Sequence, residues 1–393
     1  MNARQGRTAP SRDRRDGGST RQNGVWAVTA ARIEDHALLS DRHSAALVTS
    51  DGTVDWLCFP RFDSPSVFGA ILDEEAGSWS IRPIGQAEIQ RQYVHGSMAL
   101  RTTFRTADGT VELIDAMALG PSSDPHRIGE HAPHSLVRRV RCLQGRVRVE
   151  MRYRPRPEYG LISPRHTTID GGVVSSGGSA RFVLSAPELD VTAADEVRTT
   201  MALRDGDVLH FAMRHAPLGV PLPPPYGQCD IAEELEGTIA DWRAWSSIHQ
   251  QYQGPWGDLV CHSGRVLQAL SYQPTGAIVA AATTSLPEAV GGERNWDYRY
   301  SWLRDASLTM EALWVAACPD EAHEFFDFVT TAAADTRTGS ALQIVFGVGG
   351  ERDLSERELP HLSGWRASRP VRVGNGAWTQ TQLDANLQRV IGA

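Results

Sequence analysis

The segment GGERNWDYRYSWLRDAS, residues 291–307, concentrates aromatic, basic and acidic side chains in one short run. It contains three arginines, two aspartates and four alternating rings: Arg294, Arg299, Arg304, Asp297, Asp305, Trp296, Tyr298, Tyr300 and Trp302. In an extended chain the rings share one side, whereas Asp297, Arg299 and Ser301 share the other. We expect a helix to follow, with Asp305 in its first turn, where the helix dipole favours a carboxylate.

Two kinds of site would use this combination of side chains. A pyranose has an apolar face that lies on an aromatic ring, and its hydroxyl groups accept hydrogen bonds from Arg and donate them to Asp with defined geometry. A buried Arg–Asp network that fixes a loop to a helix would use the same residue types. The residues alone leave both interpretations open.

Other candidate residues carry weaker signals. The loop VGGERDLSERE, residues 348–358, supplies the carboxylates of Glu351, Glu356 and Glu358. These groups could act as acid and base, but a solvated charged loop has the same composition. The GVGG run beside them lacks the strand–helix context and the lysine of a phosphate-binding loop. His36 and His43 could be catalytic, although ordinary partly buried histidines fit the pattern as well.

The first half of the chain, from about residue 25 to 215, is expected to form β-strands. Apolar runs are paired across Asp51-Gly52, Asp108-Gly109 and Asp205-Gly206, which predicts three hairpins. In GRVRVEMRYRP, residues 145–155, apolar and charged side chains alternate, as in a strand with one dry and one wet face. Many strands joined by tight turns predict a β-sandwich.

A proline-rich segment, PLGVPLPPPYG at residues 217–227, separates the strands from a helical region. Apolar residues from 231 to 245 recur at helical spacing. Further helices are expected at about 259–271, 302–314 and 321–334, and from 377 onwards. The polar stretch 336–376 between the last two is typical of a binding loop on a helical scaffold.

Composition excludes several classes of protein. The 393 residues are 41% hydrophobic and 22% charged, and the net charge of −8 gives no general attraction to nucleic acid or an anionic membrane. No apolar run of about 18 residues predicts a membrane span. All 39 basic residues are Arg, which fits either codon usage or fork-like recognition of anions.

The ends and cysteines of the chain indicate a cytoplasmic protein. Residues 1–24 carry six arginines without an apolar core, so they predict a disordered basic tail rather than a secretory signal. Such a tail could contact RNA, but we expect a solvated tail and no nucleic-acid or membrane partner. The five cysteines are scattered, which argues against disulfides and a zinc site. The oligomeric state is open, a homo-oligomer included.

Three blocks of this sequence resemble glycoside hydrolase family 15, which contains glucoamylases, glucodextranases and bacterial trehalases. Residues 276–314, which include the opening segment, are similar to the family signature. Residues 33–73, from IEDHALLSDRHSAAL to GAILD, resemble the trehalase-like N-terminal domain of its prokaryotic members, and residues 341–384 match a third block. The resemblance covers nearly all of residues 25–384.

The resemblance implies a multidomain β + α fold, an N-terminal β-sandwich followed by the first part of an (α/α)6 barrel. The expected parts are the tail at 1–24, the sandwich at 25–228, a linker helix at 229–254 and an incomplete barrel at 255–393. It also implies hydrolysis of α-linked glucosides, such as trehalose or maltooligosaccharides, with inversion. A carboxylic acid and a carboxylate roughly 6.5–9.5 Å apart then flank the scissile bond. No organic cofactor is implied, although some trehalase-like members use phosphate and magnesium.

Site residues are carried over through the Trp-x-Arg-Asp element of the signature. Trp302, Arg304 and Asp305 correspond to the residues that hold the non-reducing glucose, and Trp296 and Tyr298 are expected to form the pocket wall or support it. The family's general acid and base lie downstream of the third block. We therefore expect both beyond Ala393 and assign no catalytic residue within the chain.

Two hypotheses follow from these expectations. The chain is an N-terminal portion of an inverting α-glucosidase, or it is a non-catalytic fragment that retains only a sugar-binding or structural role. A third, in which Glu351 or Glu356 has become the acid, requires that carboxyl group to reach the scissile oxygen. A partial ring of helices should expose apolar faces and be unstable unless another chain completes it.

Overall fold

The computed structural model describes residues 30–187, 195–248, 252–315, 319–333 and 343–382. The basic tail predicted at 1–24, Cys318 and the end of the chain lie outside these ranges. Residues 31–393 form one compact unit, to which the following description applies. Within the described ranges, none of the helices combines the length and apolar character needed to span a bilayer.

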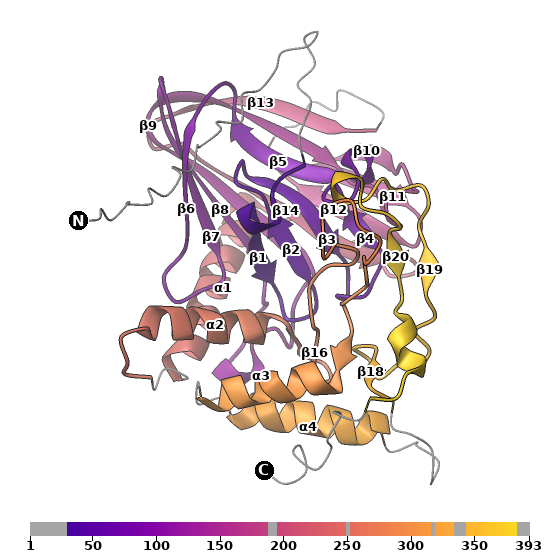
Figure 1. Ribbon diagram of the computed structural model, residues 1–393. Coiled ribbons are helices and arrows are strands. Elements are labelled where there is room, and N and C mark those ends of the chain that lie inside the picture. The colour runs from indigo at the N-terminus through magenta and orange to yellow at the C-terminus, as the bar shows by residue number, and fades with distance from the viewer. Residues whose placement is uncertain (1–29, 188–194, 249–251, 316–318, 334–342, 383–393) are drawn as a thin grey trace, which may run out of the picture. The chain divides into compact units, whose positions relative to one another are not determined.

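Fourteen strands form one hydrogen-bonded network with two layers (Figure 1). The first layer has the order β1-β2-β3-β5-β9-β13, with β4 beside β3, and the second has the order β6-β7-β8-β9-β14-β12-β11-β10. The strands of the first layer are β1 Ala37–Ser40, β2 Ala45–Val48, β3 Thr53–Cys58, β4 Ser66–Phe68, β5 Ser78–Pro83 and β13 Val197–Arg204. Those of the second are β6 Glu88–Tyr93, β7 Leu100–Thr106, β8 Gly109–Met117, β10 Arg165–Ile169, β11 Gly172–Gly177, β12 Ala180–Ser185 and β14 Val208–Pro217.

The long strand β9, Ser135–Arg154, belongs to both layers. Its first half pairs with β8 and β14, and its second half pairs with β5 and β13. In the second half Val147, Val149, Met151 and Tyr153 are all buried, so the predicted alternation of a dry and a wet face is confirmed. These side chains join apolar residues of both layers in one core, as a β-sandwich requires.

One of the three predicted hairpins is wrong. The turns at Asp51-Gly52 and Asp108-Gly109 connect paired strands, β2 to β3 and β7 to β8. At Asp205-Gly206 the chain does not reverse, because β13 and β14 both run antiparallel to β9, one after the other. Gly206, whose φ is 85°, instead lies at an irregularity where the chain passes from one layer to the other.

Helix α1, Gln228–Ile248, follows the proline-rich segment and touches two cores. Its first half places Ile231, Leu235 and Ile239 on the outer face of the second layer, in a cluster with residues of β8, β9 and β14. Its last turns place Trp242 and Trp245 in a different cluster, with residues of the later helices. The helix therefore packs against both the sandwich and the helical region. The domain limits at 228 and 254 stay a prediction.

The remaining helices are α2 Gly257–Ala269, α3 Leu303–Val315 and α4 Pro319–Ala333, of which α3 and α4 lie side by side (Figure 1). They share an apolar core with sandwich residues such as Phe62 and Ile128. Trp256, Leu259 and Leu308 remain exposed on this region. Where the sequence predicts a helix from 377, the described part has only the 3-10 turn Gly376–Thr379, followed by non-helical residues to 382, and the rest of the predicted range lies outside the described residues.

Short paired segments connect these helices. They are β15 Ser271–Tyr272 with β16 Ala277–Ile278, β17 Ser301–Trp302 with β18 Val345–Phe346, and β19 Arg357–Glu358 with β20 Arg372–Val373. The described part of the stretch 336–376 consists otherwise of loop, as predicted, apart from the 3-10 turn Trp365–Ala367. The remaining 3-10 turns are Ile33–Asp35, Glu74–Ala76 and Pro125–Arg127.

Candidate functional site

The aromatic segment runs extended from Asn295 to Trp302 and then enters α3. Backbone hydrogen bonds fix it to a second extended segment, because Ala280 and Ala281 donate to the carbonyl oxygens of Tyr300 and Tyr298, at 3.0 and 2.9 Å. Strand β17 then pairs with β18, and Leu303 donates to Ile344. The first turn of α3 therefore follows directly from a strand held on both sides.

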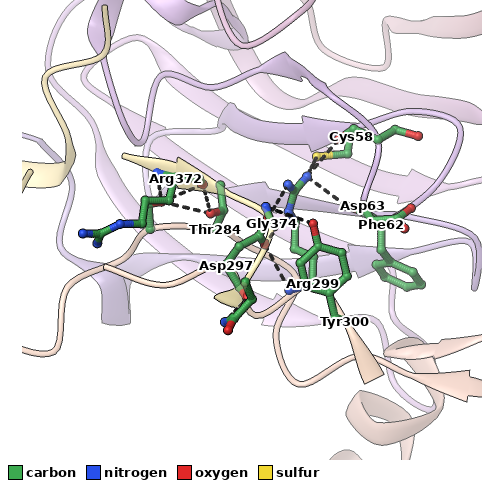
Figure 2. Close-up of polar contacts among 12 residues, drawn as sticks. Cys58, Phe62, Asp63, Thr284, Asp297, Arg299, Tyr300, Arg372 and Gly374 are labelled. Carbon is green, nitrogen blue, oxygen red and sulfur yellow. Dashed lines mark hydrogen bonds and ion pairs between the residues drawn. The ribbon is translucent and has the colours of Figure 1, made fainter. Parts of the chain in front are cut away.

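The two sides of the segment have different environments, as the period-two alternation predicted. Asp297, Arg299 and Ser301 are fully buried. Arg299 forms a bidentate ion pair with Asp297, with distances of 2.9 Å from Nε to Oδ1 and 2.7 Å from Nη2 to Oδ2 (Figure 2). Burial acts to lower the pKa of Arg299, but Asp297 outweighs it, so that pKa lies above its ordinary value. The guanidinium is a permanent cation in the interior.

The aromatic side is only partly exposed. The ring of Trp302 lies 5.5 Å from that of Tyr298 and 6.5 Å from that of Tyr300. Trp302 and Tyr300 are buried with Ile344, Val345 and Leu354, whereas 37% of Tyr298 is exposed. The ring that can lie against a ligand is therefore that of Tyr298, with Trp302 packed beside it.

Arg304 and Asp305 lie in the first turn of α3, as predicted. The side chains are each 46% exposed, and Arg304 Nε is 3.6 Å from Asp305 Oδ2. Arg304 Nη1 also donates to Gln382 Oε1, at 3.2 Å. Asp305 Oδ2 is a buried atom, 3.6 Å from Arg304 Nε, and it accepts no hydrogen bond from the described residues, so the exposed part of this side chain lies elsewhere than at Oδ2. A cation and an acceptor oxygen thus lie together at an exposed helix start.

The structure brings four of the five predicted binding residues together. Tyr298 and Trp302 are in ring contact, and Arg304 and Asp305 follow Trp302 directly in the first turn of α3. Burial is the main cause that raises the pKa of Tyr298, and the charges of Glu288 and Asp305 add to it. Tyr298, Trp302, Arg304 and Asp305 accordingly form one group. Trp296 packs elsewhere, with the Arg372 guanidinium 4.6 Å from its ring centre. This group can hold a neutral polyhydroxyl ligand through a ring, a donor and an acceptor.

Two of the three carboxylates named in the 348–358 loop, those of Glu351 and Glu356, are engaged in ion pairs. Glu351 lies 2.8 Å from Arg61 and accepts from the Gly349 N–H at 2.9 Å, while Glu356 lies 2.8 Å from Arg372. Burial acts to raise the pKa of Glu351, but backbone N–H groups and Arg61 outweigh it, and the pKa lies below its usual range. A general acid needs the opposite shift, so this geometry argues against Glu351 as a proton donor.

The two histidines singled out from the sequence have structural partners. His36 Nε2 is 2.8 Å from Asp55 Oδ2, and its Nδ1 is 2.9 Å from the Arg32 carbonyl oxygen. His43 Nε2 is 2.9 Å from the carbonyl oxygen of Gly129. Both side chains therefore connect segments of the sandwich through hydrogen bonds.

Several residues of the site were not identified from the sequence. Gln382 contacts Arg304, and Tyr159 and Asn375 contact the buried side of the segment. Alternation did signal that Asp297 and Arg299 share a face, and the network interpretation suits this pair. The Asp297–Arg299 pair does not fix a loop to a helix, however, because the other partners of Arg299, Ser64 and Tyr159, belong to the sandwich.

Comparison with known families identifies the protein family that has this arrangement of residues. Residues 19–208 match the family model described as "Trehalase-like, N-terminal", and residues 254–391 match the model described as "Glycosyl hydrolases family 15". The chain belongs to glycosyl hydrolases family 15. The segment with Tyr298, Trp302, Arg304 and Asp305 lies within the second match.

Curated relatives of this family member are longer than the chain itself. It is 39% identical over 373 residues to a protein named trehalase from Mycolicibacterium smegmatis, covering 90% of this chain and 55% of the relative. It is 36% identical over 377 residues to a trehalase from Mycobacterium tuberculosis, covering 90% and 54%. The chain thus spans about half the length of the curated relatives it matches.

A solved structure confirms the fold of this family member. The bacterial glucoamylase complexed with acarbose matches with a TM-score of 0.56 and 11% identity, over 82% of this chain and 53% of the glucoamylase. The predicted β-sandwich followed by part of a helical barrel is therefore confirmed. For magnesium, the described residues contain no group of three or more His, Cys, Asp or Glu side chains that could hold a metal ion. No step is assigned to a metal.

Proposed function

We propose that this protein binds the non-reducing glucose unit of an α-linked glucoside and belongs to an enzyme that hydrolyses the bond to that glucose. The observation that carries the proposal is the partly exposed Arg304–Asp305 pair at the start of α3, directly after Trp302, whose ring lies 5.5 Å from that of Tyr298. Arg304 would donate to hydroxyl oxygens, and the partly exposed Asp305 carboxylate would accept from a hydroxyl group. The Tyr298 ring would cover an apolar face of the sugar.

Trehalose is the first substrate that we propose, because the two similar bacterial relatives are named trehalases. Maltose and longer glucans remain alternatives, since a clamp for one terminal glucose is compatible with each of them. We propose inverting hydrolysis with an acid and a base carboxylate about 6.5–9.5 Å apart. Neither carboxylate is assigned, and the pairing of Glu351 and Glu356 with arginines disfavours both.

The second candidate function is sugar binding without hydrolysis by the 393-residue chain. The ion pairs of Glu351 and Glu356 favour this candidate, because they disfavour both carboxylates as acid or base. The proposed sugar clamp itself does not require an acid–base pair. Purified chain should be incubated separately with trehalose and with maltose, and both glucose release and sugar binding should be measured. Binding without release supports the second candidate, release supports hydrolysis, and the absence of both contradicts the proposal.

Changing the clamp should weaken sugar binding. We expect Arg304→Ala and Asp305→Ala each to raise the dissociation constant for the bound disaccharide roughly 10- to 100-fold, because each removes a hydrogen bond to a charged group. Isothermal titration calorimetry measures the effect. In a version of the enzyme that turns over, Asp305→Ala should also strongly reduce hydrolysis.

A matched control for the clamp variants is Arg294→Ala. Arg294 belongs to the same segment, but its side chain is 70% exposed and pairs with Glu288 at 3.0 Å. We expect its dissociation constant to stay within about twofold of the wild type, since exposed ion pairs contribute little. Equal binding by Arg304→Ala, Asp305→Ala and the control would rule out the clamp assignment.

A further inference from the structure

The buried Arg299 connects the aromatic segment to the sandwich, far away in the sequence. Its Nη1 donates to the Ser64 carbonyl oxygen at 2.8 Å, and its Nη2 donates to the Tyr159 hydroxyl at 2.9 Å. The guanidinium carbon also lies 5.6 Å from the ring centre of Tyr159 and 5.9 Å from that of Trp56. One fully buried side chain is thus held by three separate parts of the sandwich.

Asp297 extends this connection to the loop that precedes the end of the described chain. Its Oδ2 accepts from the Gly374 N–H at 3.2 Å, and its carbonyl oxygen accepts from Asn375 Nδ2 at 3.0 Å. The Gly374 N–H lies 3.1 Å from the hydroxyl of Tyr300 as well. The Asp297–Arg299 pair therefore joins three segments: the sandwich, residues 295–302, and residues 372–375.

The anchored residues alternate with the residues of the proposed clamp. Tyr298 lies between Asp297 and Arg299, so its backbone is held on both sides by buried groups. Three residues after Arg299, Trp302 ends the strand that leads into α3 and Arg304. Because a bidentate ion pair has fixed geometry, the position of Arg299 defines where the Tyr298 ring and the first turn of α3 can lie.

We propose that Arg299 is a positioning residue through which the N-terminal sandwich sets the geometry of the sugar clamp. The inference rests on the proposed function, because it concerns the same clamp. The inference assigns the sandwich a role in ligand binding, although the sandwich contacts Arg299 on the buried side of the segment and not the clamp residues themselves. Three sandwich side chains enter this connection: the Tyr159 hydroxyl, the Trp56 ring and Cys58 Sγ, which lies 3.6 Å from Arg299 Nη1. Of these, the Tyr159 hydroxyl can be removed without altering the clamp.

Tyr159→Phe tests the inference directly. We expect the variant to bind trehalose about three- to tenfold more weakly, because the guanidinium loses one hydrogen bond, and to exchange backbone amide hydrogens faster within residues 296–306. Arg299→Lys should have a larger effect on both readouts, since an ammonium keeps the charge but not the planar fork that reaches Asp297, Ser64 and Tyr159 together. Calorimetry measures the binding and hydrogen-exchange mass spectrometry measures the amide exchange. Both are carried out on variants that circular dichroism has first shown to be folded.

Tyr153→Phe is the matched control. Tyr153 is an equally buried tyrosine of the same sandwich, but it packs with Phe68 and Trp79 in the core. Its variant should bind trehalose within twofold of the wild type. Wild-type binding that persists unchanged in Tyr159→Phe and Arg299→Lys overturns the inference. Failure of the wild type to bind trehalose or maltose instead refutes the proposed function, and the positioning role with it. If Arg299→Lys does not fold, Tyr159→Phe decides alone.

Discussion

The Arg138→Met variant is expected to lose about 3–5 kcal/mol of unfolding free energy, the typical cost of removing one partner of a buried ion pair. Arg138 and Asp115 are both fully buried inside the sandwich, with 2.8 Å between Nε and Oδ1. The guanidinium also donates to the carbonyl oxygens of Trp79 at 2.7 Å and Gly52 at 2.6 Å. Its loss would leave a buried carboxylate and two buried carbonyl groups without their donor. Urea unfolding followed by fluorescence measures the change.

Two further variants separate the ion pair from a general effect of removing an arginine. Arg198 forms an ion pair with Glu150, and its side chain is 51% exposed. The Arg198→Met variant should therefore change the unfolding free energy by less than about 1 kcal/mol. Asp115→Ala combined with Arg138→Met should be more stable than Arg138→Met alone, because no unpaired carboxylate remains. Similar losses in Arg138→Met and Arg198→Met would contradict the prediction.

A second large effect is expected when the pH is lowered. Burial, reinforced by the neighbouring His134, lowers the pKa of His215 from 6.5 to about 4. The ring lies 6.3 Å from that of His134 and 5.8 Å from that of Phe182. His43, 5.0 Å from His134, also has its pKa lowered, chiefly by burial. The charged groups close to this cluster are Asp41, whose Oδ2 is 3.7 Å from His134 Nδ1, and Arg42, whose charge also lowers the pKa of His43.

The sign of the pH effect follows from the lowered pKa. Below pH 6.5 the unfolded chain binds a proton at His215 that the folded protein does not bind until about pH 4. Stability from the neutral ring is therefore complete above pH 6.5 and is lost progressively as the pH falls to about 4. The loss is about 3 kcal/mol, since one pKa unit corresponds to about 1.4 kcal/mol.

Unfolding in urea at pH values from 4 to 8 measures this contribution. We expect His215→Gln to show a shallower decrease of unfolding free energy between pH 6.5 and 4, because glutamine does not titrate. The matched control is His323→Gln on α4, where the histidine is exposed. A wild-type slope that persists in His215→Gln would show that other groups cause the acid sensitivity.

Local patterns in the sequence predicted the elements that form the candidate site. The alternation from Trp296 to Trp302 predicted an extended segment with Asp297, Arg299 and Ser301 on one side, and these three residues are fully buried. The charge pattern around Asp305 predicted a helix start, and α3 begins at Leu303. Such predictions succeed because a strand and a helix have fixed periods that are written in neighbouring residues.

Other features depended on partners that are distant in the sequence. Asp205-Gly206 has the composition of a hairpin turn, yet β9 accepts both flanking strands in the same direction, so the dipeptide forms an irregularity instead. Trp296 follows the same period-two spacing as the other three rings, but it packs against Arg372 and not with them. In both cases the local preference is weak compared with the long-range pairing that the chain gains.

The sequence by itself determined the family, through a long motif of specific residues, and it determined which side chains share a face, through local periodicity. Only the tertiary structure decided which charged pair is structural and which is accessible. Asp297–Arg299 and Arg304–Asp305 have the same composition, but the first is enclosed by the sandwich and the second lies at an exposed helix start. The physical reason is desolvation, because burial depends on chain segments far apart in the sequence and not on the residues beside the pair.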